Sequence, residues 1–324
     1  MKTTWNKLLT LVRGLRARAA ALGLCAAAVK DYVRRRWQWL CSLVAPPPRP
    51  FRVLSLGGGL DSFALLLLAL QRGEHIDLVV FADVRDPAGE DPGEWPGTYQ
   101  HLREVVMPLC QREGIPFVWL DSSLVPLRPS REYPEGHRSL FAYYQTKGMM
   151  FGRISRVCTM AAKVDRIKTY VRAQRPAGAP VEMWVGFEAG EESRAQRDPH
   201  AAGQDKSWVT RFPLIEAGLC RCACEALVRT AGYPVPRKSA CVFCPFATRG
   251  DFQRLAQVQP ETFAAVVALE EAARPTRRGI KLRFLGELPL AQAIEAPYRP
   301  RAQPCDVCGA PVRARKEVGC GFQS

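Results

Sequence analysis

The sequence predicts an α/β protein in which helices cover both faces of a mainly parallel sheet. Short apolar segments alternate along the chain with longer segments of helical periodicity. The apolar segments 53–56 and 78–81 show no alternation of polar and apolar residues, which is typical of strands buried on both faces. With 324 residues, of which 47% are hydrophobic, the chain can bury a substantial core. These observations predict a three-layer arrangement.

The expected elements follow in order from residue 51. Strands are expected over 52–56, 76–83, 117–121 and 181–187. Helices are expected over 61–71, 99–113, 158–174, 220–230, 249–257 and 260–273. The segments 84–97 and 190–206 are polar, contain glycine or proline and have no periodicity, so we expect them to be long functional loops.

Residues 1–50 are expected to form a separate basic helical extension. They hold ten Lys and Arg residues against the single acid Asp31, whereas the whole chain carries a net charge of +15. Contact with a membrane surface or a nucleic acid, organelle targeting and an appendage without chemistry are all consistent with this pattern. No segment reaches the roughly 18 apolar residues of a membrane span, so none is expected.

Most of the twelve cysteines are clustered. Residues 220–224 form a CxCxC run, and residues 241–244 and 305–308 form two CxxC pairs. A long chain without a persuasive secretory signal does not resemble a small disulfide scaffold. We therefore expect a cytoplasmic protein whose cysteines include thiolate ligands for a metal.

A glycine-rich loop follows the first predicted strand. Gly57, Gly58 and Gly59 precede Leu60, Asp61 and Ser62 and then a strongly helical segment. Successive glycines permit positive φ angles, and their backbone N–H groups can surround a phosphate at the positive end of the following helix. The loop matches neither GxxxxGK[ST] nor GxGxxG, and three glycines alone predict only a tight turn.

Further segments give this loop its context. In chain order they are Phe81-Ala82-Asp83, Cys158-Thr159 with Lys163, the pattern Gly186, Glu191 and Arg194, and residues 236–246 with the sequence PRKSACVFCPF. Together with the glycine loop they resemble the phosphoadenosine phosphosulfate (PAPS) reductase family. That family is part of the PP-loop ATP pyrophosphatase, or adenine nucleotide alpha-hydrolase-like, superfamily. The resemblance covers about residues 51–275.

The resemblance implies a Rossmann-like three-layer fold with a helical, cysteine-rich C-terminal part. It divides the chain into an extension (1–50), a nucleotide-binding domain (51–216), a helical cysteine-containing segment (217–275) and a tail with a possible zinc knuckle (276–324). It also implies ATP, or adenylyl sulfate (APS) or PAPS, together with Mg²⁺.

The nucleotide site implied by the resemblance has its phosphates on residues 57–62. Its other expected members are Asp83, Gly186, Glu191 and Arg194, with Asp61 and Lys163 as catalytic residues. Asp61 is equally consistent with a helix N-cap. Lys163, Arg194 and Arg211 are candidates for neutralising phosphate or sulfate charge. One departure is Gly57, where the family usually has a serine.

Cys241 and Cys244 have the spacing of a metal-binding pair. The resemblance to APS reductases adds Cys158, and the alignment favours Cys224 as the fourth ligand. Four thiolates suit either a 4Fe-4S cluster or zinc, and the placement favours the cluster. Three tail cysteines suggest a second metal site, and the last of them also resembles a nucleophilic tail cysteine: Cys305, Cys308 and Cys320.

The favoured function is ATP-dependent adenylation of a substrate with pyrophosphate release, followed by sulfur transfer with an iron-sulfur cluster. One alternative is an APS or PAPS reductase whose nucleophile is Cys320. Another is a protein that binds or thiolates tRNA or DNA. The expected partners are an adenine nucleotide and a sulfur donor such as a cysteine desulfurase or thioredoxin. The sequence predicts neither the acceptor substrate nor the oligomeric state.

Overall fold

The computed structural model describes residues 48–129, 132–148, 157–198, 207–237, 239–276, 279–298 and 302–313, together with Asp31, Arg34 and Arg35. The chain divides into two compact units, Met1–Pro48 and Arg49–Ser324. The predicted extension therefore lies almost entirely outside the described residues. The predicted segments from residue 51 onward all belong to the second unit. No helix in the described ranges is long and apolar enough to cross a membrane.

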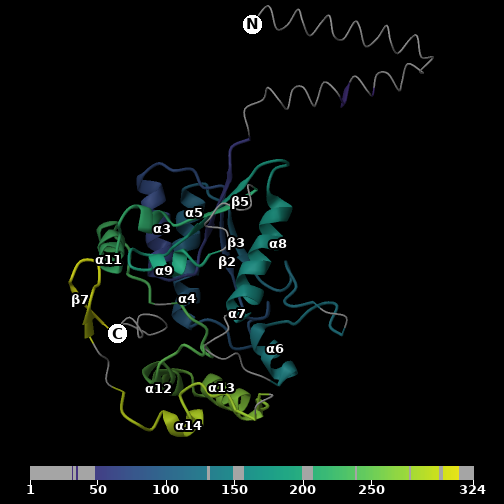
Figure 1. Cartoon of the computed structure of the whole chain (residues 1–324), viewed down its shortest axis with the longest axis vertical. Helices are drawn as coiled ribbons and strands as arrows, with labels where there is room; N and C mark the ends of the chain where they lie inside the picture. The colour runs from purple at the N-terminus through teal and green to yellow at the C-terminus, as the bar shows by residue number, and fades with distance from the viewer. Residues whose placement is uncertain are drawn as a thin grey trace, which may run out of the picture. The chain divides into compact units, whose positions relative to one another are not determined.

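A five-stranded parallel sheet forms the centre of the second unit, which confirms the predicted α/β class (Figure 1). Its order is β3-β2-β1-β4-β5, and every neighbouring pair is parallel. The strands are β1 (Phe51–Ser55), β2 (Leu78–Ala82), β3 (Phe117–Leu120), β4 (Val181–Val185) and β5 (Trp208–Arg211). Strand β5 was not predicted, because its four residues include Thr and Arg and form an edge with little apolar signal.

Alternate residues of the strands pack into different cores. Leu54 and Val79 face a core built with α3, η1, α5 and α11, whereas Val53 and Val80 face a core built with α8. The helices are α3 (Leu60–Gln71), α5 (Met107–Arg112), α8 (Asp165–Gln174) and α11 (Arg221–Thr230), and η1 (Leu102–Val106) is a π-helical turn. Figure 1 shows α3 and α8 on opposite sides of the sheet. This double coverage explains why the central strands lack polar alternation.

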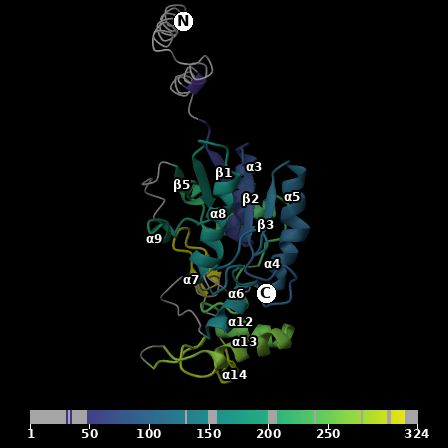
Figure 2. The same cartoon turned by 90° about the vertical axis from the view of Figure 1, so that its right-hand side faces the viewer.

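A third core lies beyond the sheet. It contains residues of α6 (Leu140–Lys147), α12 (Arg249–Val258), α13 (Pro260–Ala272) and α14 (Leu290–Ala293), which lie together in both views (Figures 1 and 2). Helix α6 was not predicted. It begins at Ser139, whose hydroxyl caps the helix by accepting a hydrogen bond from the Ala142 N–H at 2.9 Å. A short apolar helix with one capping residue gives a weak periodic signal.

The remaining elements surround this framework. Helices α4 (Pro96–His101), η1 and α5 follow one another without a break, as do α7 (Val157–Thr159), the π-helical turn η2 (Met160–Val164) and α8. Short helices α9 (Glu192–Ala195) and α10 (Pro213–Glu216) flank β5. The tail contains a hairpin of β6 (Ala302–Pro304) and β7 (Pro311–Arg313).

Candidate functional site

The glycine loop lies where the order of strands reverses. From β1 the chain continues to β2 on one side, while β4 pairs with the other side of β1. Ligands of open α/β sheets bind at such a switch point, outside the carboxyl ends of the strands. Gly57 follows β1 after one intervening residue, Leu56, and Gly186 directly follows β4. The structure therefore brings these two predicted site residues to the same crevice.

The loop glycines have different structural requirements. Gly58 has φ of +75°, and a Cβ there would lie 2.6 Å from Cγ2 of Thr98. It is therefore restricted to glycine by both conformation and space. A Cβ at Gly57 would meet its nearest neighbour, Ser239 Oγ, at an ordinary 3.7 Å. A serine, which the PAPS reductase family usually has at this position, would consequently fit.

Ser62 closes the loop from inside. Its hydroxyl accepts a hydrogen bond from the Gly57 N–H and donates one to the Gly59 carbonyl, both at 3.1 Å. Gly59 is the N-cap residue of α3, so the first-turn amides of this helix follow directly. Such amides have no acceptor within their own helix, and the helix dipole favours an anion beside them. The loop thus has the chemistry of a phosphate site.

Gly186 allows the second strand to approach this loop. A Cβ at this position would lie 2.8 Å from both the backbone N and the Cα of Ser62. Any larger residue would force β4 away from the first turn of α3. The glycine of the predicted Gly186, Glu191 and Arg194 pattern is therefore required by close packing against the loop.

Asp61 forms an ion pair and is not the N-cap. Oδ2 of Asp61 lies 3.4 Å from a guanidinium nitrogen of Arg221, in the first turn of α11. The backbone N–H of Arg221 donates to Glu188 at 3.1 Å. The cap is Gly59, so the N-cap alternative for Asp61 is wrong. Arg221 was missed in the sequence because it lies between two cysteines that drew the interpretation towards metal binding.

Asp83 is buried, and both of its carboxylate oxygens accept hydrogen bonds from other protein groups. Its Oδ1 accepts hydrogen bonds from the Tyr99 hydroxyl at 2.8 Å and the Arg85 N–H at 3.0 Å. Its Oδ2 accepts one from Trp119 Nε1 at 2.9 Å. The structure thus places Asp83 as an anchor for the wall of the site, whereas the sequence interpretation gave it a direct nucleotide contact.

Lys163 is paired with a buried carboxylate that the sequence did not reveal. Its Nζ lies 2.5 Å from Oε1 of Glu94, whose side chain is fully buried. Burial opposes the charged amine, but Glu94 and then Cys241 outweigh it and raise the pKa of Lys163. The Cys241 thiol donates to the same Glu94 oxygen at 3.9 Å. Lys163 lies in η2, and π-helical turns are frequent at functional sites.

The segment 239–244 lies across the site. Ser239 Oγ would be 3.2 Å from a Cβ at Gly59, so this segment packs directly against the glycine loop. Backbone hydrogen bonds from Trp95 to Ala240 and from Val242 to Gly93 pair it with the long loop 84–97. That loop is therefore attached to the cysteine segment and positions Glu94 beside Cys241.

The other predicted cationic residues have protein partners. Arg194 pairs with Glu191 at 2.9 Å within one helical turn and stacks on the Phe187 ring at 4.2 Å. Arg211, at the end of β5, pairs with Glu216 and, at 3.4 Å, with Glu182. Each of these arginines is therefore partly neutralised by a neighbouring carboxylate.

The four predicted cluster ligands are not brought together. Cys158, Cys241 and Cys244 all lie close to the Tyr144 hydroxyl, and burial with these thiols raises the pKa of Tyr144. Cys224 instead lies fully buried in the core beneath α3. Burial and then the Asp61 charge raise the pKa of Cys224, which keeps it protonated. The structure thus corrects the predicted set at Cys224.

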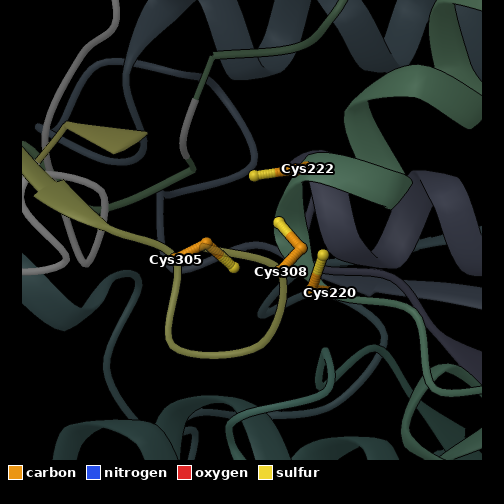
Figure 3. A group of neighbouring side chains, drawn as sticks. All are labelled: Cys220, Cys222, Cys305 and Cys308. Carbon is orange, nitrogen blue, oxygen red and sulfur yellow. The ribbon is translucent and has the colours of Figure 1, made fainter. Parts of the chain in front are cut away.

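A different group of four cysteines does converge. The sulfur atoms of four residues lie within 4.8 Å of one another: Cys220, Cys222, Cys305 and Cys308. Figure 3 shows two of them at the start of α11 and two on the turn between β6 and β7. The group can bind a metal ion. Two of the three cysteines predicted for a second metal site, Cys305 and Cys308, belong to this group, and the third, Cys320, lies outside the described residues.

Helix geometry explains why this set was missed. The sequence predicts a helix over 220–230, and residues four positions apart on a helix share a face, so Cys220 would lie with Cys224 and not with Cys222. In the structure Cys220 is the N-cap residue with extended backbone angles, φ −78° and ψ 171°. Its side chain therefore does not follow helical periodicity, and it points with Cys222 towards the tail.

The tail turn supports a thiolate. The Cys305 carbonyl accepts a hydrogen bond from Gly309 N–H at 2.8 Å, and Gly309 has φ of +72°. The backbone N–H of Cys308 lowers the pKa of Cys305 to about 7, whereas burial raises the pKa of Cys222 to about 12. A thiolate at Cys305 thus accepts hydrogen bonds from neighbouring thiols, and a bound metal would displace their protons.

Comparisons with known proteins give limited matches. No protein-family model matches the chain. A probable lipid kinase YegS-like protein from Pseudomonas aeruginosa is 30% identical to this chain over 115 residues. The match covers 36% of this chain and 35% of the relative, so the chain spans about a third of the length of that protein. The phosphate complex of PAPS reductase from Candida auris aligns with a TM-score of 0.34 and 11% identity, over 58% of this chain and 76% of that one.

Proposed function

We propose that this chain is an ATP-dependent enzyme that adenylates an acceptor, releases pyrophosphate and then replaces the adenylate with sulfur. The observation that carries the proposal is the glycine loop at the switch point, with the thiol-bearing segment 239–244 packed against it. A phosphate site and a sulfur nucleophile are thereby joined in one crevice.

The first step uses the loop. The triphosphate of ATP would lie on the amides of residues 57–62, with Mg²⁺ and Asp61 beside it. An oxygen of the acceptor attacks the α-phosphorus, and the bond to the β-phosphate oxygen breaks as pyrophosphate leaves. Arg221, which pairs with Asp61, and Lys163, which pairs with Glu94, would contribute positive charge. Positioning and charge neutralisation are the protein's contribution.

The second step uses Cys241 and Cys244. A persulfide donor, such as a cysteine desulfurase, places one sulfur atom on Cys241. That sulfur attacks the carbon bearing the adenylate, AMP leaves with its C–O bond electrons, and the product is held as a disulfide. Cys244 then attacks Cys241 Sγ and releases the product thiolate. The two thiols are oxidised to a disulfide, which a thioredoxin-like dithiol reduces.

The predicted four-thiolate iron-sulfur cradle does not fit this site, because Cys224 lies in a different core from Cys241. The proposed sulfur carrier is therefore a persulfide. The Cys244 N–H donates to the Cys241 carbonyl at 3.1 Å, which closes a turn between the two. Both side chains are partly exposed, as sulfur delivery requires.

The products of ATP distinguish this function from others. Purified chain with ATP, Mg²⁺ and an acceptor pool of tRNA, DNA or small metabolites should yield AMP and pyrophosphate. ADP would indicate transfer of the terminal phosphate and contradict adenylation. Sulfite formed from APS or PAPS with thioredoxin would indicate a reductase. After incubation with a desulfurase and cysteine, mass spectrometry should find an added sulfur on Cys241 that is absent in Cys241→Ser.

Two glycines of the loop form a matched pair. Gly58→Ala places a side chain at φ +75° and against Thr98. Left-handed backbone costs roughly 1–2 kcal/mol, so ATP binding measured by calorimetry should weaken about tenfold or more. Gly57→Ser restores the family residue where space exists, and should bind ATP equally or more tightly. Equal ATP affinity of the two variants would contradict a phosphate site here.

A further inference from the structure

We propose that Cys220, Cys222, Cys305 and Cys308 form a structural tetrathiolate zinc site that fixes Arg221 against the glycine loop. The zinc assignment stands on the sulfur geometry alone. The role of Arg221 in nucleotide binding rests on the proposed function. The two parts are therefore tested separately.

The spacing of the sulfur atoms favours a single ion. Zinc–sulfur bonds of about 2.3 Å in a tetrahedron place the sulfurs about 3.8 Å apart. The four sulfurs here all lie within 4.8 Å of one another. A 4Fe-4S cluster binds each thiolate to a different iron and puts its iron–sulfide core between them, which requires a wider cradle. The observed group is compact enough for zinc.

The ligand set also has the chemistry of a closed structural site. It contains four sulfurs and no carboxylate or histidine, so no position is left for water or substrate. Cys220 and Cys305 are buried, whereas Cys308 is exposed, so the ion would lie near the surface and be accessible to chelators. Residues 305–308 are held in their turn by hydrogen bonds with Gly309 and Ala310.

The site would connect segments that are far apart in sequence. The hairpin of residues 302–313 contains one CxxC turn, and the start of α11 supplies the other two thiols (Figure 3). Short hairpins of this kind bury little apolar surface and gain stability from a metal. The zinc would therefore hold the tail against the first turn of α11.

Arg221 lies between two of the ligands. Its guanidinium is 3.4 Å from Asp61, and its backbone N–H donates to Glu188. Cys220 and Cys222 are its immediate neighbours, so fixing both thiols fixes the backbone from which the Arg221 side chain extends. Zinc would act on nucleotide binding through this residue without touching the nucleotide.

Metal analysis tests the first part without any nucleotide. The full chain should contain one zinc per molecule, and Co²⁺ exchanged into it should show the visible bands of a tetrahedral thiolate complex. Cys308→Ser, which changes an exposed side chain, should lower zinc affinity, and Cys305→Ser/Cys308→Ser should abolish binding. Cys241→Ser/Cys244→Ser is the matched control and should retain the zinc. Iron in this site, or zinc lost only in the control, would overturn the assignment.

Hydrogen exchange tests whether zinc holds the tail hairpin against the first turn of α11. Removing zinc with a chelator should increase exchange in residues 219–224 and 302–313 but not in α8, whether or not the chain binds ATP. Unchanged exchange in those two segments would contradict the proposal that zinc holds them together.

A double-mutant cycle tests the role of Arg221. Zinc removal and Arg221→Ala should each weaken ATP binding about tenfold, and zinc removal should have no further effect in Arg221→Ala. If zinc removal and Arg221→Ala weaken ATP binding additively, the proposal that zinc acts through Arg221 is wrong. If wild type binds no ATP, the proposed function fails, while zinc content and exchange still decide the zinc site.

Discussion

The two groups of cysteines beside the crevice have different surroundings. We call the α11 side with its four converging thiols the thiol wall, and the side with Glu94, Lys163 and Cys241 the charged wall. On the α11 side, four thiols converge on one another without a carboxylate. On the opposite side, Cys241 lies beside the Glu94 and Lys163 ion pair, and Cys158 and Cys244 surround a tyrosine hydroxyl. Both sides contain a CxxC pair, so the motif alone does not determine the chemistry. The thiols on the two sides therefore differ in their surroundings, and we propose metal binding for one group and sulfur transfer for the other.

The largest expected effect tests the charged side. Lys163→Met leaves the fully buried Glu94 without its partner, and an uncompensated buried charge costs about 3–5 kcal/mol of unfolding free energy. Denaturant unfolding should show this loss. The matched control is Lys147→Met, which removes an exposed pair with Glu132 and should cost at most about 1 kcal/mol.

A second variant separates charge from packing at this pair. Glu94→Gln/Lys163→Met removes both charges and should recover part of the stability lost in Lys163→Met. If the double variant is no more stable than Lys163→Met, burial of charge does not explain the loss. The contrast between the charged wall and the thiol wall would then be wrong.

Helix α4 ends in a buried histidine. His101 packs edge-to-face on Phe63, and burial lowers the pKa of His101 to about 4. The unfolded chain takes up this proton near pH 6.5, so the stability contribution is complete above that pH and is lost as the pH falls to about 4. The shift corresponds to about 3 kcal/mol.

His101→Phe should remove this part of the pH dependence. The unfolding free energy of the wild type should fall relative to that of the variant by about 3 kcal/mol as the pH decreases from 6.5 to 4, because only the wild type loses the contribution. His75→Gln, at an exposed site, is the control and should follow the wild-type profile. A constant difference between wild type and His101→Phe would contradict the assignment.

The smallest effect concerns the link between Asp83 and Glu94. The Tyr99 hydroxyl donates to Asp83 and accepts from the Glu94 N–H, both at 2.8 Å. Tyr99→Phe leaves both groups buried without this partner and should cost about 2 kcal/mol of unfolding free energy. Tyr233→Phe removes an exposed hydrogen bond from Arg112 and should lower the unfolding free energy much less than Tyr99→Phe does. Equal losses would show that this network does not support the charged wall.

Much of the framework was predictable because its signals are local. Four of the five parallel strands, the long helices and the position of the glycine loop follow from apolar runs and from glycines between a strand and a helix. Strand β5 and helix α6 were missed, because short elements in polar or aromatic sequence carry little periodic information. Glu94 lies in an irregular loop, and no sequence signal distinguished it from other acids there.

The sequence by itself determined the alternation of strands and helices and the position of the glycine loop between a strand and a helix, because both depend on neighbouring residues. Only the tertiary structure decided which thiols meet. Cys224 and Cys220 differ by four positions, yet one is buried under α3 and the other joins the tail cysteines. The physical reason is that Cys220 precedes the helix in extended backbone, and that contacts with a distant hairpin depend on how the whole domain packs.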